Sequence, residues 1–369
     1  MARLEEICEI LDSKRVPITG KDRIAGPYPY YGANGVQDYV ADYIFDDELV
    51  LLAEDGGHFG STDKPIAYRV SGKCWVNNHA HVLKPKACLD VDYLCYSLMY
   101  RDVRDIVNGA TRQKLTQADM RKINIPLPSL DEQKAIVSKI KKVFSLIDMR
   151  QKQLAKLDHL VKYRFVEMFG DPVLNPMGWS TKPFLEMGYC KNGMNFHTGD
   201  SGVEIHCLGV GDFKDYSVID GTEHLPKVSL NETPPEEYLL KDDDIVFVRS
   251  NGNKALVGRC LLVHPHDIPT TYSGFCIRYR LTSNEVNTMY LLHVLKTDSM
   301  RKKMAGRGAN IQNLNQQILA SLAIPVPPVE LQDEFVKCVN KISGIKLTIQ
   351  SSLDKLEVLK KSLMQEYFG

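Results

Sequence analysis

The stretch GATRQKLTQADMRKINIPLPSLDEQ, which begins at Gly109, returns as GANIQNLNQQILASLAIPVPPVELQ from Gly308. The two copies align without a gap, and the match continues to a Phe-Gly pair that closes each copy. Across residues 109–170, 20 of the 62 aligned positions are identical, where roughly 4 would be expected by chance from average composition. An internal duplication therefore organises the chain.

The repeat divides the chain into a variable part, a shared part, a second variable part and a second shared part. Residues 1–108 and 171–307 do not align with each other beyond a Leu-Glu pair, Leu4-Glu5 and Leu185-Glu186. Gly, Pro and Asn in residues 170–180 favour turns and indicate a hinge. The predicted boundaries are 1–128 for the first domain, 129–169 for a long helix, 170–180 for the hinge, 181–327 for the second domain and 328–369 for a second long helix.

Each shared part predicts one long helix. Proline disfavours helix in the residue before it, so the helix can begin only after the second proline of an Ile-Pro-x-Pro stretch. Ser129 is a candidate N-cap, with Asp131 and Glu132 in the first turn. Apolar residues then recur over about five heptads, interrupted at Arg150 and Lys346, which is typical of a coiled coil. The residues predicted to pair the two helices are Ile136, Ile140, Val143, Ile147, Leu154, Leu157, Val339, Ile342, Leu353 and Leu356.

The same stripes would also fit two amphipathic helices, each packed on its own domain. The variable parts contain strand-like runs at 39–44, 49–53, 66–70, 80–83, 205–210, 244–249, 258–263 and 274–281, with helical stretches near 93–107 and 289–303. The predicted fold class is α+β: two mixed α/β domains, each followed by a long helix.

Basic residues gather just before the repeat in both halves, and polar loops lie between the strands. Such clusters suit phosphate contacts, and Arg, Lys, Asn and Gln suit base edges. A solvated helix face and ordinary turn chemistry are the alternatives. The residues predicted to bind DNA are Arg112, Gln113, Lys114, Arg249, Asn251, Asn253, Lys254, Arg301, Lys302, Lys303, Arg307, Asn310 and Gln312; Asn77-Asn78-His79 and Tyr30-Tyr31 are weaker candidates.

Composition and absent motifs narrow the function classes. The net charge is zero, and the nine cysteines form no CxxC pair, which favours a reducing cytosol over a disulfide framework or a zinc site. The sequence has no apolar run of 18 residues and no signal peptide, so we expect a cytoplasmic protein. Walker A, Asp/Asn-Pro-Pro-Tyr/Phe, GxGxxG and GxSxG motifs are absent. His79 and His81 lack a third ligand nearby in the sequence, so we expect no metal site. Because the motifs named above are absent, we expect no cofactor and no catalytic residue.

Two unlike α/β domains, each followed by a copy of one long helix, resemble the specificity subunits of type I restriction–modification enzymes. The I-P-x-P-x-x-x-x-Q stretch, the FGDPVLNPMGW hinge at 169–179, the DIVFVRSNG run at 244–252 and the YYGANG run at 30–35 carry the resemblance. It implies that each variable domain is a target-recognition domain for half of a split DNA site. It also implies that the helices pair as an antiparallel coiled coil with pseudo-twofold symmetry.

The resemblance further implies two methyltransferase and two restriction subunits as partners, which supply adenosylmethionine, ATP and magnesium, while this chain performs no catalysis. Two other classes remain open on the sequence. A self-sufficient methyltransferase or nuclease would bind adenosylmethionine as an isolated chain. A coiled-coil scaffold that recognises something other than DNA would fail to shift random duplex in a gel at low salt.

Overall fold

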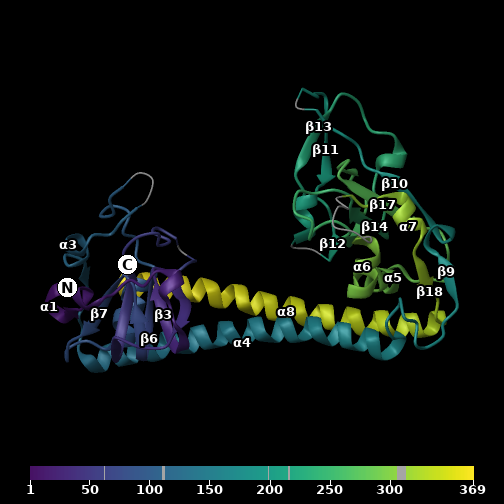
Figure 1. The fold of residues 1–369 in the computed structure, drawn as a ribbon. Helices are drawn as coiled ribbons and strands as arrows, with labels where there is room; N and C mark the ends of the chain where they lie inside the picture. The colour runs from purple at the N-terminus through teal and green to yellow at the C-terminus, as the bar shows by residue number, and fades with distance from the viewer. Residues whose placement is uncertain (62, 110–112, 198, 215–216, 306–312) are drawn as a thin grey trace. The chain divides into compact units, whose positions relative to one another are not determined.

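A computed structural model describes residues 1–369 apart from 62, 110–112, 198, 215–216 and 306–312. The chain forms two compact units. Unit 1 comprises Met1–Gln153 and Thr348–Gly369, and unit 2 comprises Leu154–Leu347. Each unit combines a mixed sheet with portions of the two long helices α4 (Leu130–Phe169) and α8 (Val329–Phe368), which are drawn in teal and yellow in Figure 1.

Unit 1 is built on a six-stranded sheet in the order β2-β7-β5-β6-β3-β4. Its strands are β2 (Cys8–Ile10), β3 (Ala25–Gly32), β4 (Gly35–Val40), β5 (Phe45–Ala53), β6 (Ala67–Val76) and β7 (Ala80–Pro85). Central β5 ends in Leu-Val-Leu-Leu-Ala, all wholly buried, because apolar residues cover both faces. Val50 and Leu52 face helix α2 (Val91–Met99), whereas Leu49 and Leu51 belong to the core on the opposite face.

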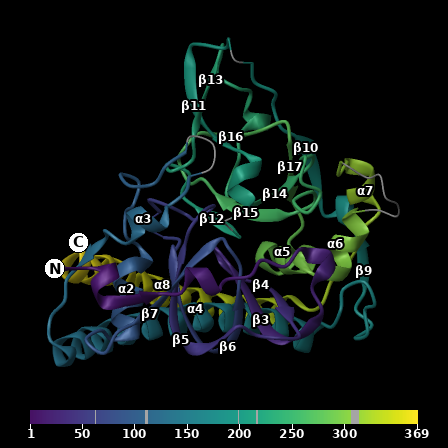
Figure 2. The ribbon, with the colours of Figure 1, turned by 60° about the vertical axis from the view of Figure 1, so that its left-hand side comes forward.

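Unit 2 is built on a five-stranded sheet in the order β10-β17-β14-β15-β12. Its strands are β10 (Gly188–Asn192), β12 (Val218–Asp220), β14 (Asp244–Val248), β15 (Cys260–His264) and β17 (Cys276–Leu281). Ile245 and Phe247 of β14 face helix α5 (Thr288–Lys296), and Val246 and Val248 face a second sheet. That sheet, ordered β13-β11-β16, consists of β11 (Val203–Leu208), β13 (Lys227–Leu230) and β16 (Thr270–Tyr272), with β11 and β13 projecting beyond the first (Figure 2).

The two units share one sheet plan. The order β2-β7-β5-β6-β3 in unit 1 matches β10-β17-β14-β15-β12 in unit 2. The strand directions match as well. The pair β3-β6 in unit 1 and the corresponding pair β12-β15 in unit 2 are parallel, and the other pairs of this shared order are antiparallel. The variable parts therefore share one sheet plan, although their sequences do not align beyond a Leu-Glu pair. Sheets tolerate any apolar residue at a core position, so a shared plan leaves little trace in residue identity.

The start of the domain shows which residues correspond. Strand β1 (Ala2–Arg3) pairs with β8 (Asn124–Ile125), and β9 (Thr181–Pro183) pairs with β18 (Ala323–Pro325) in the same antiparallel sense. The Leu4 amide then donates to the Ile123 carbonyl at 3.0 Å, as the Phe184 amide does to Leu322 at 2.9 Å. Ile123 and Leu322 are repeat partners, so Leu4 corresponds to Phe184. The alignment of Leu4 with Leu185 is one residue out of register.

A buried glutamine ties the start of each long helix to its domain. Gln133 and Gln332 are both wholly buried and make the same three hydrogen bonds. In unit 1, Gln133 accepts from the amide of Asp90 (2.9 Å) and donates to the carbonyls of Cys88 (3.0 Å) and Pro128 (2.9 Å). In unit 2, Gln332 accepts from the amide of Asn287 (2.8 Å) and donates to the carbonyls of Glu285 (3.0 Å) and Pro327 (2.8 Å). The Gln that both copies of the I-P-x-P-x-x-x-x-Q stretch carry is thus a buried polar side chain whose hydrogen bonds are satisfied by the backbone.

The first turn of α4 is closed by a capping box. The Ser129 amide donates to the Glu132 carboxylate at 2.9 Å, and the Glu132 amide donates to Ser129 Oγ at 3.4 Å. The predicted N-cap is confirmed. The predicted helix near 93–107 is wrong beyond Met99, where α2 ends. The one near 289–303 is broken at Thr297, whose extended backbone separates α5 from α6 (Asp298–Ala305).

Within unit 1, the start of α4 lies beside the end of α8. Lys139 Nζ donates to Tyr367 Oη at 3.2 Å, and Lys360 Nζ lies 5.7 Å from the centre of the Phe144 ring. These contacts place later α4 residues against earlier α8 residues, so the segments run antiparallel. Of the predicted pairing residues in this unit, Ile140, Val143, Ile147 and Leu353 are buried, and Ile136 and Leu356 are half-buried.

Within unit 2, the end of α4 lies beside the start of α8. Arg164 pairs with Glu334 at 2.9 Å, and Lys346 pairs with Asp158 at 2.6 Å, again in antiparallel order. Lys346, which interrupts the apolar stripe, thus has a partner on the other helix. Of the predicted pairing residues here, Val339 and Ile342 are buried, and Leu154 and Leu157 are half-buried.

Candidate nucleic-acid interface

Three loops meet at one end of the sheet in unit 2. They follow β14, precede β17 and precede helix α7 (Gln316–Ala320). The Arg249 amide donates to the Phe275 carbonyl at 2.8 Å, and the Leu314 amide donates to the Arg249 carbonyl at 2.7 Å. A β-bridge joins Ser250 to Asn313. We call this the three-loop end of unit 2.

The corresponding loops of unit 1 meet in the same way. The Glu54 amide donates to the His79 carbonyl at 2.9 Å, the Leu115 amide donates to the Glu54 carbonyl at 2.8 Å, and a bridge joins Asp55 to Lys114. Leu115 is the repeat partner of Leu314, so Glu54 corresponds to Arg249. The backbone of the three-loop end is thus alike in both units, whereas its side chains differ in charge.

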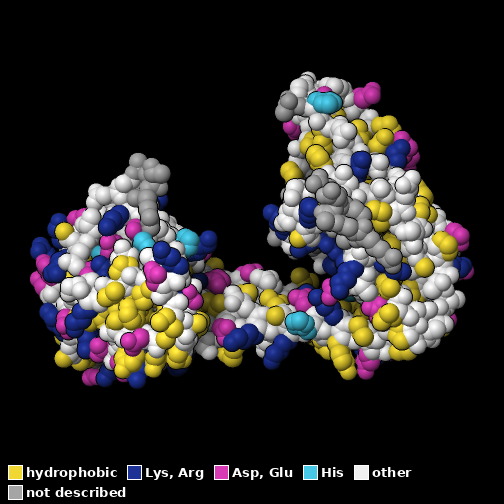
Figure 3. Space-filling model, in the orientation of Figure 1, with side chains coloured by type: hydrophobic (Ala, Val, Ile, Leu, Met, Phe, Trp, Pro, Cys, Tyr) yellow, Lys and Arg dark blue, Asp and Glu magenta, His cyan; other side chains and the backbone are white. Residues whose placement is uncertain are grey.

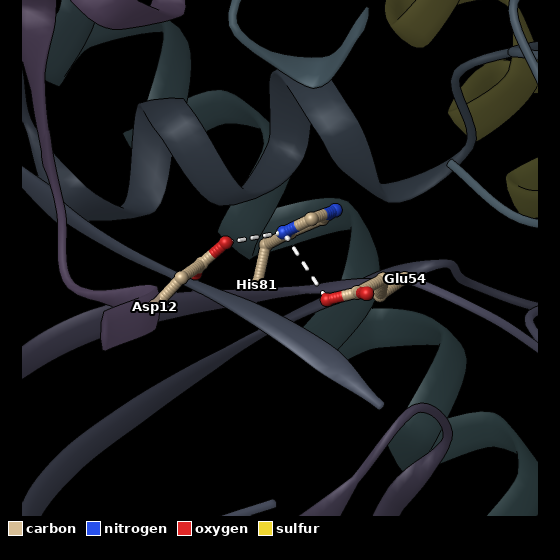
Figure 4. Close-up of side chains that lie close together, drawn as sticks. All are labelled: Asp12, Glu54 and His81. Atoms are coloured by element: carbon tan, nitrogen blue, oxygen red, sulfur yellow. Dashed lines mark hydrogen bonds and ion pairs between the residues drawn. The ribbon is translucent and has the colours of Figure 1, made fainter. Parts of the chain in front are cut away.

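A buried ionic network holds the three-loop end of unit 1 together (Figure 4). Asp12 Oδ2 accepts from His81 Nδ1 at 2.7 Å, and His81 Nε2 lies 2.9 Å from the Leu115 carbonyl, to which it donates. Glu54 pairs with Arg15 at 2.6 Å and with Lys114 at 2.9 Å. His81 therefore links the sheet to the loop that carries Leu115.

Both carboxyl groups of this network have lowered pKa values. Burial by itself raises the pKa of Asp12, but hydrogen bonds from His81, Gln117 and the Val82 amide outweigh it and lower the pKa below its usual value. Burial also raises the pKa of Glu54, and hydrogen bonds from Arg15 and Lys114 reverse the direction. Both groups are therefore carboxylates at neutral pH.

Asp12, Glu54 and His81 lie close enough to one another to hold a metal ion. The structure thus brings together two carboxylates that lie far from His81 in the sequence, while His79 pairs with Asp55 instead at 2.8 Å. Arg15 and Lys114 already neutralise the carboxylates. The residues therefore fit an internal ion network, and a resident metal would have to displace two cations.

The predicted DNA-binding residues of the unit 2 loop lie at its three-loop end. Arg249 is half-buried, and its guanidinium reaches the Gly274 carbonyl at 3.4 Å. Asn251 Oδ1 accepts from the Asn253 amide at 2.8 Å, a turn contact that leaves the Asn251 amide nitrogen as a donor. Asn251 also lines a hollow of about 460 Å³. Asn253 and Lys254 are exposed beside it.

The part of the basic cluster of unit 2 that the structure describes lies on α5 and α6 and comprises Lys296, Arg301, Lys302 and Lys303. Lys302 and Lys303 are exposed on α6, and dark-blue side chains gather over that helix in Figure 3. Burial lowers the pKa of Arg301, whose guanidinium donates to the Ala255 carbonyl at 3.2 Å. Burial likewise lowers the pKa of Lys296, which donates to Ser217 Oγ at 2.7 Å. Lys302 and Lys303 are thus the members of the cluster with the most accessible charge.

In unit 1, two basic residues near the start of the repeat are already paired with carboxylates. Lys114 is paired with Glu54, and Arg104 is paired with Asp102 at 2.6 Å. Gln113 is exposed next to Lys114. Among the described residues, the charges of Lys114 and Arg104 are therefore partly neutralised by carboxylates of the same unit. Arg112, Arg307, Asn310 and Gln312 lie outside the described residues.

Sequence reasoning does not single out Phe275, which is 59% exposed at the three-loop end of unit 2. Phe275 lies inside a run of strand-forming residues, 274–281, and the run predicts that it belongs to a strand. The strand begins at Cys276 instead, which leaves Phe275 in the loop. Phenylalanine is itself common in strands, so the sequence pattern does not mark this boundary.

Comparison with known proteins identifies the family to which this architecture belongs. A family model described as the type I restriction modification DNA specificity domain matches residues 1–159 and 222–358. The chain belongs to this family. It is a specificity subunit of type I restriction–modification systems, with DNA-recognition domains. No helix in the described part of the chain is long and apolar enough to cross a membrane.

Specificity subunits from several organisms are similar to this one along most of its length. A Haemophilus influenzae protein assigned as a type I restriction enzyme specificity subunit is 26% identical over 98% of this chain and 94% of its own. The StySPI specificity subunit of Salmonella potsdam is 26% identical over 87% of this chain and 74% of its own. The crystal structure of a type I S subunit from M. genitalium matches the whole chain, and 95% of that chain, with a TM-score of 0.57 at 16% identity, which supports the fold.

Proposed function

We propose that this specificity subunit reads a split, asymmetric DNA target, with one half-site read by each unit. The observation that carries the proposal is the three-loop end. Its backbone is alike in both units, but Glu54 and Asp55 of unit 1 stand where unit 2 has Arg249 and Ser250. Bases are distinguished by donors, acceptors and methyl groups in the major groove. Two ends with unlike side chains therefore select unlike half-sites.

We propose that α4 and α8 pair along their length as an antiparallel coiled coil and set the distance between half-sites. The antiparallel contacts within each unit support this arrangement. Readers on one face of DNA sit about one helical turn apart, roughly 10 base pairs centre to centre, by analogy with dimeric major-groove proteins. Half-sites of a few base pairs then leave an unread gap of roughly 5–8 base pairs.

The chain itself is proposed to be non-catalytic. Two methyltransferase subunits and two restriction subunits bind to it in the cytoplasm and supply adenosylmethionine, ATP and magnesium. The absence of Walker A, methyltransferase and dinucleotide motifs supports this division. Purified chain with duplex DNA, adenosylmethionine, ATP and magnesium should neither methylate nor cut. Sustained turnover that follows the chain through purification would overturn this part of the proposal.

The target is tested by mapping methylated bases in cells that express this chain with its cognate methyltransferase subunit. The expected motif has two different short half-sites separated by a fixed gap. A continuous palindrome would contradict the proposal, because one palindrome cannot reflect two unlike reading surfaces. Absence of any methylated motif in cells where both subunits are present and associated would also contradict it.

A further inference from the structure

We infer that His79 and Phe275 are corresponding base-reading residues, one in each half of the target. This rests on the proposed function and names the side chains that give each half-site part of its identity. His79 directly precedes β7, and Phe275 directly precedes β17. The carbonyls of both accept the amide of the first residue after the central strand, Glu54 at 2.9 Å and Arg249 at 2.8 Å.

The backbone of Phe275 is held firmly while its side chain points away from the core. Its carbonyl accepts from the amides of Arg249 and Ser250, and its amide donates to Ser273 Oγ at 3.3 Å. The side chain is 59% exposed, and the next residue, Cys276, is wholly buried. A single exposed apolar side chain is common on protein surfaces, so the exposure of Phe275 matters here because the ring also lines a hollow at the three-loop end.

Phe275 lines a hollow of about 460 Å³ that also has polar walls. The other residues that line it are Val210, Ser250, Asn251, Gly252, Ser273 and Asn313. Amide and hydroxyl groups suit hydrogen bonds to base edges, and the ring supplies one apolar wall. The apolar group that a base pair offers in the major groove is the thymine methyl. Phe275 therefore selects a base pair that carries that methyl.

His79 offers different chemistry at the corresponding place. Its Nδ1 lies 2.8 Å from Asp55 Oδ1, and its side chain is 35% exposed. A neutral imidazole that donates from Nδ1 to a carboxylate has Nε2 as an acceptor. An acceptor recognises an amino group, adenine N6 or cytosine N4, in the major groove. Asp55 acts as a positioning residue, since it sets the tautomer and orientation of His79.

Phe275 thus selects a thymine methyl in one half-site, and His79 selects a base amino group in the other. The test is to map the methylated motif in cells expressing the subunit with its methyltransferase, for wild type, Phe275→Ala and His79→Ala. Each variant should relax one position, reducing discrimination there by about tenfold, the scale of one base contact. The two relaxed positions should fall in different half-sites.

Two further variants serve as controls. Phe275→Leu retains an apolar contact and should keep the thymine preference that Phe275→Ala loses. Leu174→Ala removes a side chain that is 79% exposed in the hinge of the same unit and should leave the motif unchanged. If Phe275→Ala and Phe275→Leu both abolish methylation, Phe275 has a structural role and the inference is wrong.

The outcomes separate the inference from the proposed function. If wild type gives a split motif and both alanine variants keep it equally strict, the inference fails while the proposed function stands. If both variants relax positions in the same half-site, the correspondence between His79 and Phe275 fails. If wild type gives no split motif, the proposed function fails, and the inference fails with it.

Discussion

The three-loop ends of the two units differ in their side chains, although the contacts at the start of each long helix correspond bond for bond. Gln133 and Gln332 make the same three hydrogen bonds. At the three-loop ends, by contrast, unit 1 has a network of paired charges around Glu54, and unit 2 has amides, hydroxyls, Arg249 and an exposed Phe275. A constant support with interchangeable loops allows recognition to change without loss of the fold.

The correspondence extends to the ring contacts at the helix ends. Phe368 meets Tyr93 edge-on at 5.1 Å in unit 1, and Phe169 meets Tyr290 edge-on at 4.8 Å in unit 2. Each tyrosine hydroxyl donates to the carbonyl of a proline of the Ile-Pro-x-Pro stretch, Pro126 at 3.2 Å or Pro325 at 3.1 Å. The closing Phe-Gly of each repeat is thus retained for packing.

The largest expected effect is the loss of stability when either buried glutamine, Gln133 or Gln332, is replaced. Gln133→Ala and Gln332→Ala each remove three hydrogen bonds that a wholly buried side chain makes to the backbone, so each should lower the free energy of unfolding by about 3 kcal/mol. Urea unfolding can follow each unit separately, because the two tryptophans are Trp75 in unit 1 and Trp179 in unit 2.

Single-tryptophan backgrounds, Trp179→Phe for unit 1 and Trp75→Phe for unit 2, supply the matched measurements. The two glutamine variants should lower the free energy of unfolding by the same amount within about 1 kcal/mol, because the two side chains make the same hydrogen bonds. A large loss of stability in one unit and none in the other would show that the two glutamines do not have the same role.

The ionic network of unit 1 should be specific to that unit. Asp12→Asn removes the carboxylate that Arg15 and His81 contact and should lower the free energy of unfolding by about 2 kcal/mol. In unit 2 the corresponding residue is Asn192, which is exposed, so Asn192→Asp should change stability by less than about 0.5 kcal/mol. Equal effects at both positions would show that the network does not distinguish the units.

The same network gives a pH test. Because the folded-state pKa of Asp12 lies below its usual value, its stabilising contribution is present above about pH 4 and is lost as the pH falls through the folded-state pKa. The stability difference between wild type and Asp12→Asn should therefore shrink below about pH 4. A difference that stays constant to pH 2 would contradict the lowered pKa.

Unit 2 should be the more acid-sensitive unit near pH 5. Burial lowers the pKa of His293 to about 3, whereas its counterpart in unit 1 is Tyr96. An unfolded histidine binds a proton near pH 6.5, so the free energy of unfolding should fall between pH 6.5 and 3, by about 1 to 2 kcal/mol at pH 5. His293→Tyr should remove this pH dependence from the Trp179 signal. A wild-type signal independent of pH from 7 to 5 would contradict it.

The smallest expected effect concerns phosphate contacts. Replacing Lys302 and Lys303 with glutamine should weaken binding to all duplexes alike and flatten the log–log salt dependence by about 0.9 for each phosphate that is no longer neutralised. Arg104→Gln in unit 1 should change the slope less, because Arg104 is paired with Asp102. The slope comes from binding titrations between low and moderate salt. An unchanged slope for the lysine variant would mean that α6 does not face DNA.

The duplication, the capped start of α4 and the general fold class could be predicted from the sequence because each depends on a recognisable pattern of residues. Proline spacing and Ser129 define where α4 can begin, and the heptad stripe defines its length. The central strands β5 and β14 are predictable as well, because uninterrupted apolar runs are typical of buried strands. Short edge strands such as β2 and β12 carry no such signal.

The candidate site was less accessible to sequence reasoning, because its partners are distant along the chain. Glu54 and Lys114 each read as loop residues, and their ion pair exists only because β5 and the segment before α3 (Gln117–Met120) meet at one end of the sheet. The correspondence of His79 with Phe275 was hidden for a related reason. It is defined by backbone hydrogen bonds to the central strand, which leave no trace in residue identity.

The central claim is that each unit reads its own half-site on a shared support. The most direct measurement replaces residues 171–307 with the corresponding domain of another such subunit and maps the methylated motif. The account predicts that one half-site changes while the other half-site and the gap stay the same. A motif in which both half-sites change, or one in which neither does, would contradict the account.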